Sequence, residues 1–228
     1  MASQAVQKRG KTTWAFTMPK SKSSPMAYLQ LDNNYEHALF QARKKYGKDT
    51  IKHLSYAVNP IGNMKDNAFI EWERFLKDFE YCVKNFRSVA VDTFTELNDV
   101  RKLAEWGRNT QIPQIYYGSI YADYRYLVNL ALNHDANVLF LHRMKDEWLN
   151  GERTGSLKLD GWGGIAYETQ VLIEHDRTPD GLNFITKVVE CTQNALLTGQ
   201  EIESSEDEND FPHLAARIFE NDPTDWED

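Results

Sequence analysis

The stretch Ala5-Val6-Gln7-Lys8-Arg9-Gly10-Lys11-Thr12-Thr13 fits a relaxed phosphate-binding loop pattern, in which Ala or Gly is followed by four residues and then by Gly-Lys-Thr. In such a loop Gly10 lets the backbone approach a phosphate, Lys11 reaches the β and γ oxygens, and the Thr12 hydroxyl holds Mg²⁺. The helix that follows points its N-terminus at the anion. The stretch therefore predicts a nucleotide site made by Ala5, Gly10, Lys11, Thr12 and Thr13, with ATP and Mg²⁺ as cofactors.

The residues before this loop do not look like the strand that normally precedes it. A phosphate-binding loop follows a central, buried strand of the sheet, and such strands are largely apolar. Only Met1-Ala2-Ser3-Gln4 precede Ala5, and these four residues are short and polar. We therefore expect the fold to be truncated at the first strand, which puts nucleotide affinity in question.

Length and composition predict one soluble α/β domain with a short appendage. The chain has 228 residues, enough for a full core, and we assign residues 1–200 to the domain and residues 201–228 to an acidic C-terminal tail. The cysteines Cys82 and Cys191 are isolated, which indicates reduced thiols and a cytoplasmic location. The longest apolar runs are far too short to span a bilayer, so we expect no membrane partner.

The acidic residues are concentrated in the tail. The formal net charge is −8, but residues 201–228 hold eleven acidic residues against the single Arg217, which leaves 23 acidic and 25 basic residues in the body. The body is thus slightly positive, and its charge does not exclude a polyanionic partner. The tail is expected to start disordered and then to form a small helix from Phe211 to Phe219.

Ser88-Val89-Ala90-Val91-Asp92 predicts a buried strand that ends in a carboxylate. Given the upstream loop, Asp92 is the candidate to hold Mg²⁺ opposite Thr12. The alternative is a structural strand whose Asp92 stands at a helix start. Thr93 and Glu96 have the spacing of a capping box, so we assign Glu96 a structural role.

Two further strands are expected, each ending in a polar residue. Met26 to Asp32 leads into a helix predicted over residues 33–45, and Asp32 fits the N-cap of that helix. Asn137 to Leu141 is a short apolar run that ends at His142, which on its own fits a surface histidine at a strand end. Near the C-terminus, residues 165–175 and 183–191 alternate and predict an antiparallel pair that turns at Pro179-Asp180-Gly181.

Arg143 to Gly164 is punctuated by glycines and shows no periodicity, so we expect a long loop there. Long loops in compact domains are usually lids or binding loops. Trp148 and Trp162 are candidates to stack on bases, and four basic side chains are candidates to bind phosphates. These basic residues are Arg143, Lys145, Arg153 and Lys158. The alternative is an ordered lid in which both tryptophans are buried.

The order of these parts resembles the RecA/RadA-like ATPases, and most closely the compact phage-encoded members linked to single-strand annealing and recombination. The resemblance runs from Ala5 to about Ile202. Its best local match is Val138-Leu139-Phe140-Leu141-His142-Arg143-Met144-Lys145, then a long loop, then Gly163-Gly164-Ile165-Ala166-Tyr167. The resemblance implies an α/β fold with a RecA-like P-loop NTPase core, in which helices flank a mostly parallel central sheet.

The resemblance also implies roles for single residues. The carboxylate that polarises the attacking water lies after the Met26 to Asp32 strand, so Asp32 or Glu36 is the implied base. His142 takes the position of the γ-phosphate sensor. Arg143 to Gly164 would be the second DNA-binding loop, and Gly107 to Gly118, which contains Arg108, would be the first.

Besides the missing first strand, three residues depart from the family's pattern. Asn34 stands where the catalytic Glu is expected, and Glu190 and Thr192 replace the paired lysines that would act across a subunit interface. These departures predict slow hydrolysis and weak assembly into a homo-oligomeric ring or filament.

The leading hypothesis is an ATP-binding, weakly hydrolysing recombination ATPase that acts on single-stranded DNA, located in the host cytoplasm if phage-encoded. Its catalytic residues would be Lys11, Asp92, Glu36 and His142. One alternative is a P-loop nucleotide-binding regulator that does not bind DNA. Another is a non-catalytic DNA-binding module with a vestigial P-loop.

Overall fold

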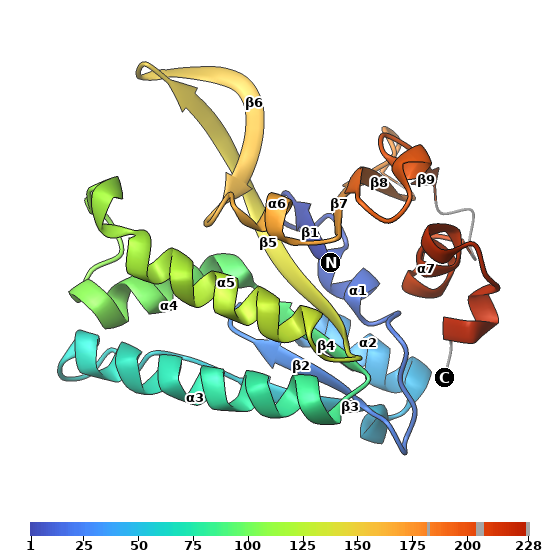
Figure 1. Cartoon of the computed structure of the whole chain (residues 1–228), viewed down its shortest axis with the longest axis horizontal. Coiled ribbons are helices and arrows are strands. Elements are labelled where there is room, and N and C mark those ends of the chain that lie inside the picture. Colours follow the sequence, from blue (N-terminus) through green and yellow to red (C-terminus); the bar gives the residue numbers. More distant parts are fainter. Residues whose placement is uncertain (182, 204–207, 227–228) are drawn as a thin grey trace.

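The computed structural model describes residues 1–181, 183–203 and 208–226, which are organised around one mixed sheet (Figure 1). Its strands are β1 (Ala2–Ala5), β2 (Met26–Gln30), β3 (Ile51–Ser55), β4 (Ser88–Asp92), β5 (Asn137–Leu149), β6 (Glu152–Asp160), β7 (Val171–Arg177), β8 (Phe184–Cys191) and β9 (Glu201–Glu203). The strand order is β3-β2-β4-β5-β1-β7-β8-β9, and β6 pairs with β5. The strands from β3 to β7 in this order are parallel, whereas β6, β8 and β9 run antiparallel to the strands they pair with.

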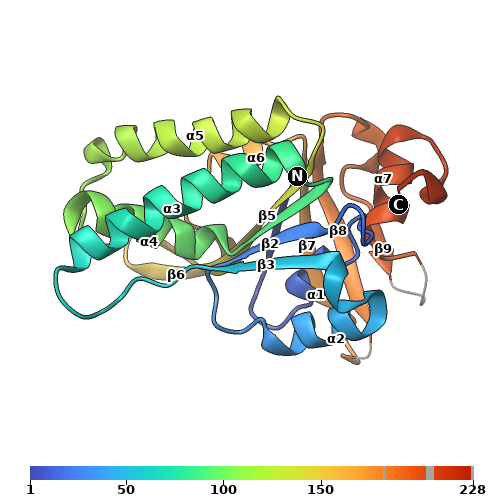
Figure 2. The ribbon, with the colours of Figure 1, turned by 90° about the horizontal axis from the view of Figure 1, so that it is seen from below.

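Helices cover both faces of the sheet. The α-helices are α1 (Lys11–Ala15), α2 (Glu36–Tyr46), α3 (Met64–Asn85), α4 (Phe94–Trp106), α5 (Gly118–Leu132), α6 (Ile165–Glu168) and α7 (Phe211–Phe219). Helices α3, α4 and α5 pack on one face, and α1, α2 and α7 pack on the other (Figure 2). Among the described residues, no helix is long and apolar enough to cross a bilayer. The predicted class, an α/β fold with a mostly parallel sheet flanked by helices, is confirmed.

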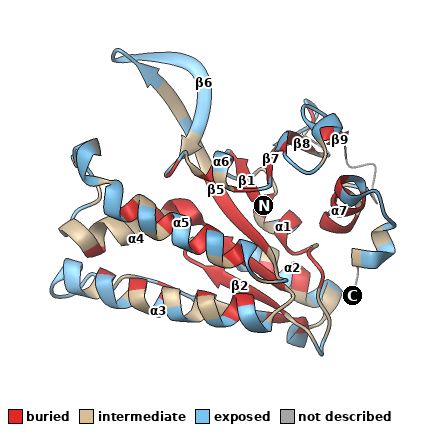
Figure 3. Cartoon of the chain, viewed as in Figure 1, coloured by how far each residue is buried: buried red, intermediate tan, exposed pale blue. Residues whose placement is uncertain are grey.

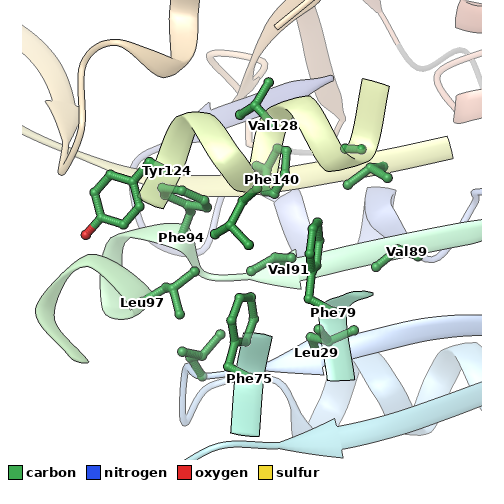
Figure 4. Close-up of a cluster of buried hydrophobic side chains, with 14 of the residues drawn as sticks. Leu29, Phe75, Phe79, Val89, Val91, Phe94, Leu97, Tyr124, Val128 and Phe140 are labelled. Atoms are coloured by element: carbon green, nitrogen blue, oxygen red, sulfur yellow. The ribbon is translucent and has the colours of Figure 1, made fainter. Parts of the chain in front are cut away.

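Strands β2, β4 and β5 each contribute to two hydrophobic cores. In β4, Val89 and Val91 face α3 to α5, while Ala90 faces the opposite core, because successive side chains of a strand point to opposite faces. The core under α3 to α5 is rich in aromatic residues (Figure 4). In it Phe79 lies between Phe75 and Phe140, with ring centroids 5.8 and 5.9 Å away.

The first strand is present, so the expected truncation is wrong. β1 lies at the centre of the sheet between β5 and β7 and runs parallel to both. All four of its residues are buried, including Ser3 and Gln4, and Gln4 Nε2 donates to Glu174 Oε2 at 3.0 Å. A strand with a partner on each side is held by its backbone hydrogen bonds, so polar side chains do not prevent it from forming.

Residues 143–164 are ordered for most of their length, so the prediction of a long loop is also wrong. β5 continues beyond the sheet to Leu149, and β6 returns beside it with Leu149 opposite Glu152. The turn between them is Asn150-Gly151, and both residues have positive φ angles, 53° and 85°. This hairpin projects from the body and is mostly exposed (Figures 1 and 3).

The C-terminal elements extend the sheet and close the second core. β7 and β8 form the predicted antiparallel pair, but the first strand begins at Val171, and residues 165–168, which were expected to belong to it, form α6. β9 then pairs with β8, so the tail is a strand where disorder was expected to start, and residues 204–207 lie outside the described part of the chain. The predicted helix is α7, whose buried Phe211 packs on Trp14 with ring centroids 6.0 Å apart.

Leu214→Ala should lower the free energy of unfolding by about 2–5 kcal/mol, because it leaves a cavity in a well-packed core. The Leu214 side chain is 1% exposed and belongs to the core formed with α1 and α2. Arg217→Ala is the matched control on the same helix. Its ion pair with Glu208 is exposed, so removing it should cost less than about 1 kcal/mol. Chemical denaturation measures both, and equal small losses would show that α7 is not part of the core.

Candidate nucleotide-binding site

The P-loop connects the end of β1 to the start of α1. Ala5 is the last residue of the strand and Lys11 is the first of the helix, so the intervening residues form the predicted turn. Gly10 is the N-cap of α1 and has a φ of 92°, a left-handed conformation that glycine adopts without strain. Its carbonyl accepts from Trp14 N at 2.9 Å, which fixes the loop to the helix.

A cavity of about 250 Å³ opens beside this turn. It is lined by Gln7, Lys8, Arg9, Gly10, Lys11, Thr12, Thr13, Asp32, Asn34, His37, Ala38, Arg177 and Phe184. Four of the predicted cofactor-binding residues therefore share one cavity, whereas Ala5 is buried behind it. A side chain at Gly10 would collide with the Phe184 ring, since an added Cβ would lie 2.7 Å from Phe184 Cδ1.

The Lys11 side chain is largely buried at the floor of the cavity. Desolvation lowers its pKa, while the nearby carboxylates of Asp92 and Asp32 act in the opposite direction. A buried ammonium group is costly without negative partners. A phosphate in the cavity would add the negative charge that this buried cation favours.

Thr12 and Asp92 meet directly, as the sequence predicts. Thr12 Oγ1 donates to Asp92 Oδ2 at 2.7 Å, and Tyr28 OH donates to the same oxygen at 2.7 Å. Asp92 is 2% exposed, and burial raises its pKa although both hydrogen bonds act to lower it. The second carboxylate oxygen has neither of these donors. Thr93 Oγ1 accepts from Glu96 N at 3.3 Å, which confirms the N-cap of α4.

The donor set fits Mg²⁺. A hydroxyl and a carboxylate are hard oxygen ligands, and Mg²⁺ in nucleotide sites usually takes one or two protein ligands and completes its shell with phosphates and water. The described residues contain no group of three or more His, Cys, Asp or Glu side chains placed to hold a metal ion. Metal binding at Thr12 and Asp92 would thus depend on a nucleotide.

Asp32 is tied to the other side of the site by Arg143. Arg143 Nη2 lies 2.9 Å from Asp32 Oδ2, and Arg143 Nη1 lies 2.5 Å from Glu96 Oε1. Although burial raises the pKa of Asp32, the Arg143 guanidinium and a bond from Asn34 hold it below its usual value. The interpretation of Asp32 as a helix N-cap is wrong, because α2 begins later and its N-cap is Tyr35.

Of the four candidate catalytic residues, only Lys11 lines the cavity; Asp92 is buried behind Thr12, and Glu36 and His142 are also absent from the lining. Glu36 is exposed on the first turn of α2 and is absent from the described lining. His142 is completely buried next to Gln4 of β1, so the interpretation as a surface histidine is wrong. Its ring nitrogens have no hydrogen-bond partner among the described groups, and its ring centroid lies 5.1 Å from that of Phe94.

The predicted DNA contacts divide into accessible and inaccessible residues. Trp162 is 4% exposed and packs against Tyr121 and Tyr124, so its predicted role in base stacking is wrong. Arg143 is held by two carboxylates and is not free to bind phosphates. The others are exposed: Arg108 in the α4–α5 connection, and Lys145, Trp148, Arg153 and Lys158 on the hairpin. Of these, Lys145 pairs with Asp160 and Arg153 with Asp146.

Three site residues were missed from sequence. In the sequence Tyr28 fits only a strand residue, yet its hydroxyl donates to Asp92. Arg177 and Phe184 flank the β7–β8 turn, and no local pattern connects them to a loop more than 160 residues earlier. Only the placement of β7 beside β1 brings them to the P-loop.

No protein-family model matches the chain, and no curated protein matches it. Solved structures do match. One is the crystal structure of the RadB recombinase, with 13% sequence identity, a TM-score of 0.54 and coverage of 89% of this chain and 85% of that chain. Another is a KaiC-like protein from the archaeon Pyrococcus horikoshii, with 13% identity, a TM-score of 0.51 and coverage of 89% and 82%. The chain therefore shares the fold of these two proteins, a RecA-like α/β fold.

Lowering the pH from about 7 to about 5 should lower the free energy of unfolding, because two buried histidines stay neutral in the folded protein. Burial lowers the pKa of both His142 and His175 to about 3, from an ordinary value of about 6.5. Between these values the unfolded chain binds protons that the folded chain does not, so stability falls as pH falls through this window. Thermal unfolding between about pH 7 and pH 5 should show a falling Tm, with a smaller slope in His142→Gln and in His175→Gln. A slope unchanged by both substitutions would contradict the burial of neutral imidazoles.

Proposed function

We propose that this chain binds Mg–ATP and hydrolyses it slowly, as a recombination-type ATPase, of the kind encoded by phages, that acts on single-stranded DNA. The observation that carries the proposal is the 2.7 Å hydrogen bond between Thr12 and Asp92. It joins the P-loop to the end of a second central strand, beside the buried Lys11. That arrangement is the one that metal-assisted phosphoryl transfer requires.

Each residue has a defined task in this proposal. Lys11 binds the β and γ phosphate oxygens. Because water is largely excluded from its ammonium group, the attraction between that group and the phosphates is weakly screened. Thr12 and Asp92 would hold a magnesium ion, which would supply positive charge next to the phosphates. Tyr28 keeps the Asp92 carboxylate in place through its hydroxyl.

Slow turnover follows from the residues around the attacking water. Asp32 lines the cavity, but its ion pair with Arg143 stabilises the carboxylate and makes it a weak base. Asn34 also lines the cavity and can orient a water molecule, but an amide cannot accept its proton. Glu36 would need a change of conformation to reach the cavity. Binding without rapid hydrolysis is the expected behaviour.

Lys11→Ala should abolish Mg–ATP binding, because the phosphates lose their buried positive partner. Asp92→Asn should leave nucleotide affinity within a few-fold of the parent but reduce hydrolysis by a much larger factor, because a neutral amide holds Mg²⁺ poorly. Calorimetry measures the first effect and phosphate release the second.

The two variants test separate parts of the proposal. No heat from the parent at millimolar nucleotide would mean a vestigial P-loop and would favour a non-catalytic module. Equal turnover in Asp92→Asn and the parent would return Asp92 to a structural role.

The DNA part of the proposal rests on the β5–β6 hairpin. Trp148 is 59% exposed near its tip, and Lys158 is exposed on the returning strand, where it forms no ion pair with a carboxylate of the described residues. An exposed aromatic ring beside cations is the usual arrangement for single-stranded DNA. The α4–α5 connection with Arg108 extends toward the same end of the molecule (Figures 1 and 2). The RadB recombinase among the similar structures agrees with this assignment.

Trp148→Ala should weaken binding of a single-stranded oligonucleotide by about 1–3 kcal/mol, the usual contribution of one base–aromatic stack. Leu149→Ala is the matched control, since Leu149 is its exposed neighbour, at 65%, and has no ring to stack. Fluorescence titration at low salt measures both variants, and the parent should show quenching that Trp148→Phe loses.

Unchanged affinity in Trp148→Ala, with no quenching in the parent, would remove the DNA part of the proposal. A nucleotide-binding regulator would then explain the chain better.

Self-association is part of the same proposal, and we expect it to be weak because Glu190 and Thr192 replace the basic pair that would act across a subunit interface.

A further inference from the structure

The β7–β8 turn brings an arginine with no assigned role to the rim of the nucleotide cavity. Arg177 is the last residue of β7 and lines the cavity together with Lys11 and Thr12. Its side chain is exposed there. Because β7 pairs with β1, the end of β7 and the P-loop lie at the same edge of the sheet.

The Arg177 guanidinium is held in place by its own turn. Its Cζ lies 4.8 Å from the centroid of the Phe184 ring, and Nη1 donates to the Gly181 carbonyl at 3.3 Å. The same Phe184 ring packs against Gly10, where an added Cβ would lie 2.7 Å from the ring. A single aromatic ring therefore separates the guanidinium from the P-loop glycine.

The carboxylates next to Arg177 are engaged elsewhere. Asp176 pairs with Arg9 at 3.0 Å, and Asp180 accepts a hydrogen bond from Thr178. Within the described part of the chain, no carboxylate forms an ion pair with Arg177. Arg143, by contrast, is neutralised by Asp32 and Glu96. The positive charge of Arg177 is thus available to an anion in the cavity.

We infer that Arg177 binds the phosphate chain of the nucleotide and completes the site from within the same chain. A guanidinium presents several donors in a planar fork that matches phosphate oxygens, and stacking on Phe184 limits the entropy lost on binding. This assignment rests on the proposed nucleotide binding and adds an anion-binding residue outside the P-loop. It also makes binding independent of a basic residue from a neighbouring subunit.

The test is calorimetry of the full chain with Mg–ATPγS, a slowly hydrolysed analogue. Arg177→Ala should weaken binding about ten- to hundredfold, the usual range for a lost charge-assisted hydrogen bond. Arg177→Lys should recover only part of the loss, because an ammonium group lacks the fork. Arg125→Ala is the matched control, since Arg125 is an exposed arginine of α5 paired with Glu168 and should bind like the parent.

Mixing two variants separates a contact within one chain from a contact across an interface. Lys11→Ala keeps Arg177, and Arg177→Ala keeps the P-loop. An equimolar mixture should bind no more tightly than Arg177→Ala alone if the arginine serves its own chain. Restored affinity in the mixture would overturn the assignment to the same chain.

The remaining outcomes distinguish this inference from the proposal beneath it. If the parent binds and Lys11→Ala does not, while Arg177→Ala stays within twofold of the parent, then Arg177 is not a ligand and the proposed nucleotide binding stands. If the parent does not bind Mg–ATPγS, both are wrong. Circular dichroism of Arg177→Ala confirms that any loss of binding occurs in a folded chain.

Discussion

The pairing of β1 with β5 on one side and β7 on the other determines where every element of the site lies. Parallel strands present their carboxyl ends at one edge of a sheet, and ligands of open α/β sheets bind outside that edge. Three adjacent strands therefore place residues at this edge. These are the P-loop after β1, Arg143 within β5 and Arg177 at the end of β7. Polar residues in β1 are tolerated because the ladders on both sides satisfy its backbone.

The ion pairs of Arg143 connect the nucleotide cavity to the hairpin. Its side chain bridges Asp32 after β2 and Glu96 on α4, while its backbone N–H donates to Thr95 Oγ1 at 3.0 Å. Thr95 in turn donates to the Asp160 carbonyl at 2.7 Å, where β6 ends. Breaking one contact of this partly buried network would leave a charge unpaired, which is costly. The network therefore holds Asp32 and the base of the hairpin in fixed positions relative to each other.

The sequence predicts the elements that a short local pattern defines. It does not predict the elements whose structure depends on pairing with a distant strand. The P-loop and the strand ending at Asp92 were found because residue types and spacing suffice to define them. β1 was missed because its stability comes from β5 and β7 and not from its own side chains. The hairpin was missed although Asn150-Gly151 is a strong two-residue turn signal, because the flanking strands are exposed on both faces and lack apolar alternation.

Arg143, which pairs with a carboxylate of the cavity, and Arg177, which lines it, show why binding and turnover need not change together in this site. Arg143 is paired with Asp32, and the pairing that stabilises this carboxylate also lowers its basicity toward water. Arg177 has no such partner among the described residues and keeps its charge for an anion. Ground-state interactions with phosphates raise affinity without lowering the barrier to chemistry. A site that combines a free cation with a neutralised base therefore favours retention of ATP over its rapid hydrolysis.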